Sequence, residues 1–148
     1  MNQRLVLFTK HLLDGMFGLG VLLTASIPIF FSWVGKYFIN FRIYYIPLTI
    51  LYVLSGILCL MILWQLRHMF DTVLADDAFV DANTISLQKM ARYSLFISLL
   101  SALRLPFSPT PATVFIMIVF FIAALFSMVL SQVFAKAVQY KKENDLTI

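Results

Sequence analysis

The chain has 148 residues, of which 61% are hydrophobic and only 12% are charged. A soluble domain is closer to half apolar and a quarter charged, so this composition excludes an ordinary water-soluble protein and indicates an integral membrane protein. The net charge of +4 does not predict direct nucleic-acid binding, because Lys and Arg are spread between apolar segments instead of forming one basic face.

The first apolar segment predicts a membrane helix over residues 12–34. The basic start of the chain resembles a signal peptide, but the apolar stretch is too long, contains Asp14 and lacks a small-residue cleavage site. We therefore expect a retained anchor. Pro28 predicts a kink in this helix, unless the outer end of the helix already lies there.

A second membrane helix is predicted over residues 44–66, followed by a cytoplasmic loop over residues 67–91. The second helix should continue past the membrane to about Leu74. The Asp and Asn side chains of the loop are suited to capping a new helix, which would feed the third crossing. The cytoplasmic loop is therefore expected to be largely helical.

The third crossing is predicted over residues 85–105, although Arg92 and Arg104 bracket only a short uncharged stretch. It depends on Arg104 snorkelling to the far interface, where lipid phosphate is its expected neighbour. The segment "PFSPTP" predicts a tight turn, because proline blocks helix continuation. A fourth helix over residues 112–137 and a cytoplasmic tail over residues 138–148 complete the chain.

The distribution of Lys and Arg predicts the orientation of the protein in the membrane. With the N-terminus inside, only Lys36, Arg42 and Arg104 lie on the outer side, and the acidic residues lie at or near the inner side. The predicted fold is all-α: one domain over residues 1–148, a four-helix membrane bundle with both termini in the cytoplasm.

Small residues mark the helix faces that are expected to pack, because lipid provides no hydrophobic drive for helix association. A serine stripe also suits a polar pathway, but tight packing with hydroxyls bonded to the backbone is the favoured interpretation. Cys59 has no partner for a disulfide and is expected to be a buried, inert thiol. The packing residues are Gly15, Gly18, Gly20, Ala25, Ser26, Ser55, Gly56, Ser94, Ser98, Ser101, Ala124, Ser127 and Ser131.

Two His-x-x-Asp pairs, His11 with Asp14 and His68 with Asp71, are candidates for metal ligation. Each pair lies on one helix face, and imidazole and carboxylate together suit several divalent metals. Polar residues beside lipid headgroups are the favoured alternative, and whether the two pairs meet is left open. Asp14 and Arg104 are also intramembrane polar candidates. Asp14 suits proton or ion coupling, with Lys10 and His11 as its expected partners.

The sequence contains no Gly-rich phosphate loop, Cys-x-x-Cys, nucleophile elbow or His-Glu-x-x-His motif. We therefore expect a non-enzymatic protein with no catalytic residue and no cofactor.

Two stretches, "LRHMFDTVLADDAFVDANTISLQKMARYSLFISL" and "VFAKAVQYKKENDLTI", resemble a family of small bacterial four-helix membrane proteins that carries only a domain-of-unknown-function label. Ala82 and Gln88 differ from the family, whose members tend to have Glu and Arg there. The resemblance implies a bacterial cytoplasmic membrane and frequent gene neighbourhood with a small helix-turn-helix regulator, but no activity. The matching positions are Phe79, Asn83, Leu87, Glu143, Asn144, Asp145, Leu146 and Thr147.

The leading hypothesis is a protein that binds a cytoplasmic partner through its inner loop and tail, in regulation or signalling. The tail is expected to fold back against the loop. The alternative is an oligomeric small transporter or channel subunit, with Asp14 and the serine faces on its pathway. The lipid bilayer is the other expected partner, and a homo-oligomer is left open. The candidate partner-binding residues are Asp76, Asp77, Phe79, Asn83, Glu143, Asn144, Asp145 and Leu146.

Overall fold

The computed structural model describes residues 2–147 and is helical with short connections over that range. Ile148, the last residue of the predicted tail, lies outside the described residues. The elements are α1 (Gln3–Val34), α2 (Ile39–Ile43), α3 (Tyr45–Leu74), α4 (Asp81–Arg104) and α5 (Pro111–Thr147).

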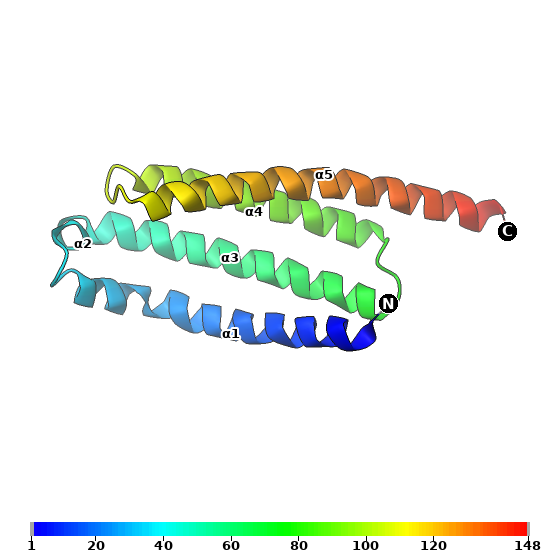
Figure 1. Ribbon diagram of the computed structural model, residues 1–148, viewed down its shortest axis with the longest axis horizontal. Helices are drawn as coiled ribbons and strands as arrows, with labels where there is room; N and C mark the ends of the chain where they lie inside the picture. The colour runs from blue at the N-terminus through cyan, green and yellow to red at the C-terminus, as the bar shows by residue number, and fades with distance from the viewer. Residues whose placement is uncertain (1, 148) are drawn as a thin grey trace.

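The four long helices form an open row (Figure 1). Within residues 2–147, α3 packs against α1 and α4, whereas α5 packs against α4 and contacts neither α1 nor α3. This differs from a closed bundle, and α1 and α5 form the two edges of the row. In lipid an apolar edge is already solvated, so no hydrophobic drive closes the row.

Neighbouring long helices run in opposite directions, which divides the polar parts of the molecule between two ends (Figure 1). Short α2 and the turn at residues 105–110 lie at one end, here called the α2 end. Both ends of the described chain and the segment 75–80 lie at the other, here called the terminal end.

Three helices, α1, α3 and α5, are long and apolar enough to cross a membrane. Few of their side chains are buried inside the protein, as expected for helices that face lipid. The third predicted crossing corresponds to α4, which is not among the three because Asp81, Lys89 and Arg92 precede its apolar half.

Two helix boundaries differ from the sequence-based expectation. α1 begins at Gln3 rather than near residue 12, because the Asn2 side chain caps it by accepting hydrogen bonds from the N–H groups of Arg4 and Leu5. α5 continues to Thr147, so residues 138–147 extend the helix and do not form a separate tail. α3 ends at Leu74, as predicted.

The interface between α1 and α3 has two close approaches at glycine. A Cβ on Gly56 would lie 2.7 Å from Thr24 Oγ1, and a Cβ on Gly20 would lie 2.9 Å from Leu60 Cδ2. Gly15 and Gly18 were predicted to pack as well, but a Cβ on either would meet nothing within 4 Å. Only part of the glycine pattern therefore reflects helix packing.

The serine faces of α4 and α5 are buried, as the packing interpretation predicted. Ser98 donates a hydrogen bond to the Met117 carbonyl on α5 at 2.8 Å, and Ser101 donates to the Ile97 carbonyl on its own helix at 2.9 Å. Ser131 of α5 donates to Met128 O at 2.6 Å. These hydroxyls are thus occupied by backbone carbonyls. Cys59 is half-buried, not fully buried as expected.

Candidate functional site

Two ion pairs link α1 and α3 at the terminal end. Arg67 donates a hydrogen bond through Nε to Asp14 Oδ1 at 2.5 Å, and Lys10 pairs with Asp71. The partners are spaced four residues apart on each helix, which places both members on one face. Asp14 was expected to pair with Lys10 or His11, but the antiparallel packing of α3 brings Arg67 to it instead.

Arg67 is held in place by aromatic rings as well as by its carboxylate partner. Its guanidinium carbon lies 5.4 Å from the centroids of the Phe17 and Trp64 rings, within the range of cation–π attraction. The two rings are themselves 5.8 Å apart. Sequence reasoning overlooked Arg67 as a site residue. The available signal was the matching four-residue spacing of Lys10–Asp14 and Arg67–Asp71.

The four metal-ligand candidates lie on the facing helices α1 and α3. Asp14 and Asp71 each bind a cation of the opposite helix, while His68 packs edge-on against Trp64 with ring centroids 5.0 Å apart. Over residues 2–147, no three His, Cys, Asp or Glu side chains gather in a way that suits a metal ion. The contacts of Asp14 and Asp71 therefore support helix pairing, and His11 is exposed on α1.

The segment that follows α3 is fixed by hydrogen bonds of Asn83, which is only 2% exposed. Its Nδ2 donates to Thr72 Oγ1 at 2.7 Å and to the Ala78 carbonyl at 2.6 Å. Asp76 closes the end of α3 with a φ of 56°, in the left-handed region that Asp tolerates better than most residues. Asn83 was proposed to bind a partner, but its burial makes it a residue that shapes the loop.

The end of α5 contacts this loop through three interactions. Lys141 pairs with Asp77, and Lys142 Nζ lies 3.0 Å from Asp81 Oδ2. The Phe79 ring lies edge-on to Phe134, with centroids 5.3 Å apart. A cavity of about 270 Å³ remains beside them, and Asp145 also lines it. We call the set Asp77, Phe79, Asp81, Phe134, Lys141 and Lys142 the α5–loop contact.

The predicted contact between the tail and the loop is present at Lys141 and Lys142, but the last residues of α5 do not fold back over the loop. The helix instead continues beyond the other helices (Figure 1), and Leu146 is 86% exposed. No Gly or Pro interrupts this stretch, and Gln139 donates a side-chain hydrogen bond to Glu143 one turn later. Glu143, Asn144 and Asp145 lie exposed in the same final turns.

Arg104, the last residue of α4, is buried between α3 and α4. It is 2% exposed, its guanidinium carbon lies 4.1 Å from the centre of the Tyr52 ring, and Nη2 donates to Ser101 Oγ at 2.9 Å. Its Nε has no hydrogen-bond partner within residues 2–147. The expected contact with lipid phosphate is therefore replaced by a cation–π contact.

Three membrane-length apolar helices with few buried side chains, and ion pairs that within residues 2–147 all lie at one end, are features of a small helical protein compatible with a membrane. The chain belongs to the family described as "Protein of unknown function (DUF2975)", whose model matches residues 36–148. This match confirms the resemblance to an uncharacterised domain family. No curated protein and no solved structure matches the chain.

Proposed function

We propose that this chain is a non-enzymatic protein of the bacterial cytoplasmic membrane that binds a cytoplasmic protein through its terminal end, in regulation or signalling. One observation carries the proposal: the end of α5 projects beyond the other helices and exposes Leu146 beside Glu143 and Asp145. A projecting helix end that exposes an apolar side chain is suited to an apolar groove on another protein.

The proposed topology has four crossings with both termini in the cytoplasm. α3 and α5 each have the length and composition of a membrane span, and α4 returns the chain between them (Figure 1). With a rise of about 1.5 Å per residue, the 24 residues of α4 form a helix that is longer than the thickness of a hydrocarbon core, which is about 30 Å. The excess of Lys and Arg at the terminal end supports a cytoplasmic location for that end.

The α5–loop contact supports a fixed binding surface. Lys141 and Lys142 anchor the base of the projecting turns to Asp77 and Asp81, so the exposed turns are ordered before a partner arrives. A preordered helix loses less entropy on binding than a disordered tail. The partner surface that complements these turns is an apolar groove bordered by Lys or Arg, which would face Glu143 and Asp145.

Chemical crosslinking in membranes followed by pull-down tests this proposal. Deletion of residues 143–148 should leave membrane insertion intact and abolish partner capture. The triple variant Glu143→Gln, Asp145→Asn, Leu146→Ala should do the same while keeping the helix length. An Asn40→Ala variant, at an exposed position of the α2 end, serves as the control and should capture the partner normally. Unchanged capture by the deletion variant would refute a role for the end of α5.

The alternative is an oligomeric transporter or channel subunit, and the open row of helices is the observation that favours it. Because α1 and α5 do not meet, a pathway would need a second copy to enclose it. The test is flux in proteoliposomes: Asp14→Asn should suppress any flux of the parent protein. Absence of flux from the parent would reject the alternative.

A further inference from the structure

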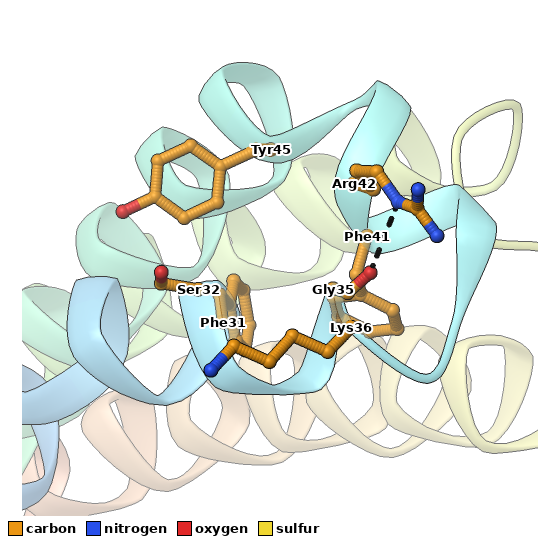
Figure 2. Close-up of a pocket in the computed structure, with 7 residues that line it drawn as sticks. All are labelled: Phe31, Ser32, Gly35, Lys36, Phe41, Arg42 and Tyr45. Carbon is orange, nitrogen blue, oxygen red and sulfur yellow. Dashed lines mark hydrogen bonds between the residues drawn. The ribbon is translucent and has the colours of Figure 1, made fainter.

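An open pocket lies at the α2 end, where α1, α2 and α3 meet (Figure 2). Its volume is about 680 Å³, within the range of small-molecule sites. Arg42 stands on one side and donates through Nε to the Gly35 carbonyl at 3.3 Å. The Lys36 side chain runs past Phe31 toward Ser32 on the other. The remaining lining residues are Phe41 and Tyr45.

The pocket has cations but no carboxylate. Neither Lys36 nor Arg42 forms an ion pair within the described chain, whereas the four ion pairs of residues 2–147 all lie at the terminal end. The Asp and Glu residues of the sequence also belong to that end. The positive charge at the α2 end therefore has no counterpart within the described protein, and an anion would supply it.

Arg104 adds a third positive charge behind the pocket wall. A row of aromatic rings links the pocket to Arg104: the ring centroids of Phe41 and Phe31 are 5.1 Å apart, and those of Phe31 and Tyr52 are 4.9 Å apart. The guanidinium carbon of Arg104 lies 4.1 Å from the Tyr52 ring centroid. A buried charge is screened little by water and salt, so its field extends further than that of an exposed one. Its unpartnered Nε leaves that charge only partly compensated.

The surroundings of the pocket distinguish a lipid from a soluble anion. Exposed Trp33 and Tyr37 directly follow the pocket residues Ser32 and Lys36 in the sequence, and exposed Phe38 and Ile39 line a second pocket at the same end. Such aromatic side chains gather where membrane helices meet the headgroup region. A phospholipid bound there would place its phosphate between the cations and its acyl chains along these apolar side chains. A zwitterionic headgroup would bring a further cation to the α2 end, where no carboxylate balances the existing positive charge. A net-anionic headgroup therefore fits this pocket better.

We propose that this pocket binds the phosphate of a net-anionic phospholipid, with Lys36 and Arg42 as its ligands. Arg42 uses Nε to hold the Gly35 carbonyl, and its two Nη groups are the phosphate donors. Lys36 contributes a flexible point charge from the other side. The site lies at the opposite end of the molecule from the α5 turns, so it is independent of the proposed partner binding.

The test uses the full chain in nanodiscs that contain equal amounts of phosphatidylglycerol and phosphatidylcholine. Native mass spectrometry after detergent extraction measures which lipid stays bound. The parent protein should retain phosphatidylglycerol preferentially, and Lys36→Gln with Arg42→Gln should reduce this preference at least about tenfold, the effect of losing one charged hydrogen bond. Lys89→Gln with Lys136→Gln removes the same charge from the terminal end and should leave the preference unchanged.

Two further arms separate charge from folding and lipid from free phosphate. Lys36→Arg with Arg42→Lys keeps both charges and should retain the preference, although it removes the Nε bond to Gly35. Soluble glycerol phosphate should not displace the bound lipid at equal concentration. Equal losses in the pocket and control variants, an unchanged preference in the pocket variant, or displacement by glycerol phosphate would each overturn the proposal.

Discussion

Arg67 of α3 and Asp14 of α1 form a hydrogen-bonded ion pair at 2.5 Å, which joins two membrane-length helices at the terminal end. Both side chains are about a third exposed, so solvent screens the pair, and its contribution to the free energy of unfolding is modest. The Arg67 guanidinium also contacts two aromatic rings, and these contacts do not depend on Asp14.

We predict that Asp14→Asn lowers the free energy of unfolding by about 1 kcal/mol in mild detergent. The exchange of partners, Asp14→Arg with Arg67→Asp, should recover part of this loss because the opposite charges again face each other. Arg67→Asp alone, which places two carboxylates together, is the matched comparison and should be the least stable variant. If the double exchange is no more stable than this single variant, the two side chains are not paired.

The glycine contacts between α1 and α3 predict opposite effects of the same substitution. Gly56→Ala should destabilise the protein by about 1–3 kcal/mol, because the new methyl group would clash with the β-branched Thr24 side chain. Gly15→Ala has open space and should raise stability by about 0.5–1 kcal/mol through helix propensity. Thermal unfolding in one detergent measures both variants, and equal effects would contradict the α1–α3 packing.

Arg104→Met is predicted to raise stability while weakening the proposed preference for anionic lipid. Within residues 2–147 the buried guanidinium has an unpartnered Nε and no carboxylate partner. Its desolvation penalty therefore exceeds the cation–π attraction, and we expect the free energy of unfolding of the Met variant to be higher by about 1 kcal/mol. Tyr52→Phe keeps the ring and should leave thermal stability unchanged. A marked fall in the melting temperature of the Met variant would show that the charge stabilises the α3–α4 interface.

The α5–loop contact predicts a specific pattern of zero-length crosslinks. Carbodiimide treatment should join Lys141 to Asp77 and Lys142 to Asp81, because both pairs are already in contact. Lys136 forms no ion pair within the described chain and serves as the internal control, so it should give few intramolecular products. Peptide mapping by mass spectrometry identifies the products, and crosslinks of Lys136 alone would place the end of α5 elsewhere.

The proposed topology is tested by labelling single cysteines in a Cys59→Ser background. Lys36→Cys and Pro109→Cys, both at the α2 end, should react with an impermeant maleimide on intact cells. Glu143→Cys should react only after the membrane is permeabilised. The Pro109 position reports specifically on α4: protection of Pro109→Cys on intact cells would show that α4 does not cross the membrane.

Local patterns in the sequence were sufficient for the class of protein and for most helix positions. The apolar runs predicted α1, α3 and α5, and "PFSPTP" predicted the break between α4 and α5, because hydropathy and proline act within a few residues. The spacing of Ser94, Ser98 and Ser101 likewise predicted a packed face on α4. The buried Asn83 and the cap at Asn2 are also local interactions, but they depend on backbone geometry that spacing alone does not specify.

The tertiary structure decided which polar groups meet. Arg67 and Asp14 are 53 residues apart, and Lys141 and Asp77 are 64 apart, so their pairing follows from the order and direction of the helices in the row. Burial of Arg104 under Tyr52 depends on the depth at which α3 and α4 pack. Apolar composition makes α1, α3 and α5 suited to a membrane, but lipid solvates every apolar face equally well, so only side-chain contacts between helices select their neighbours.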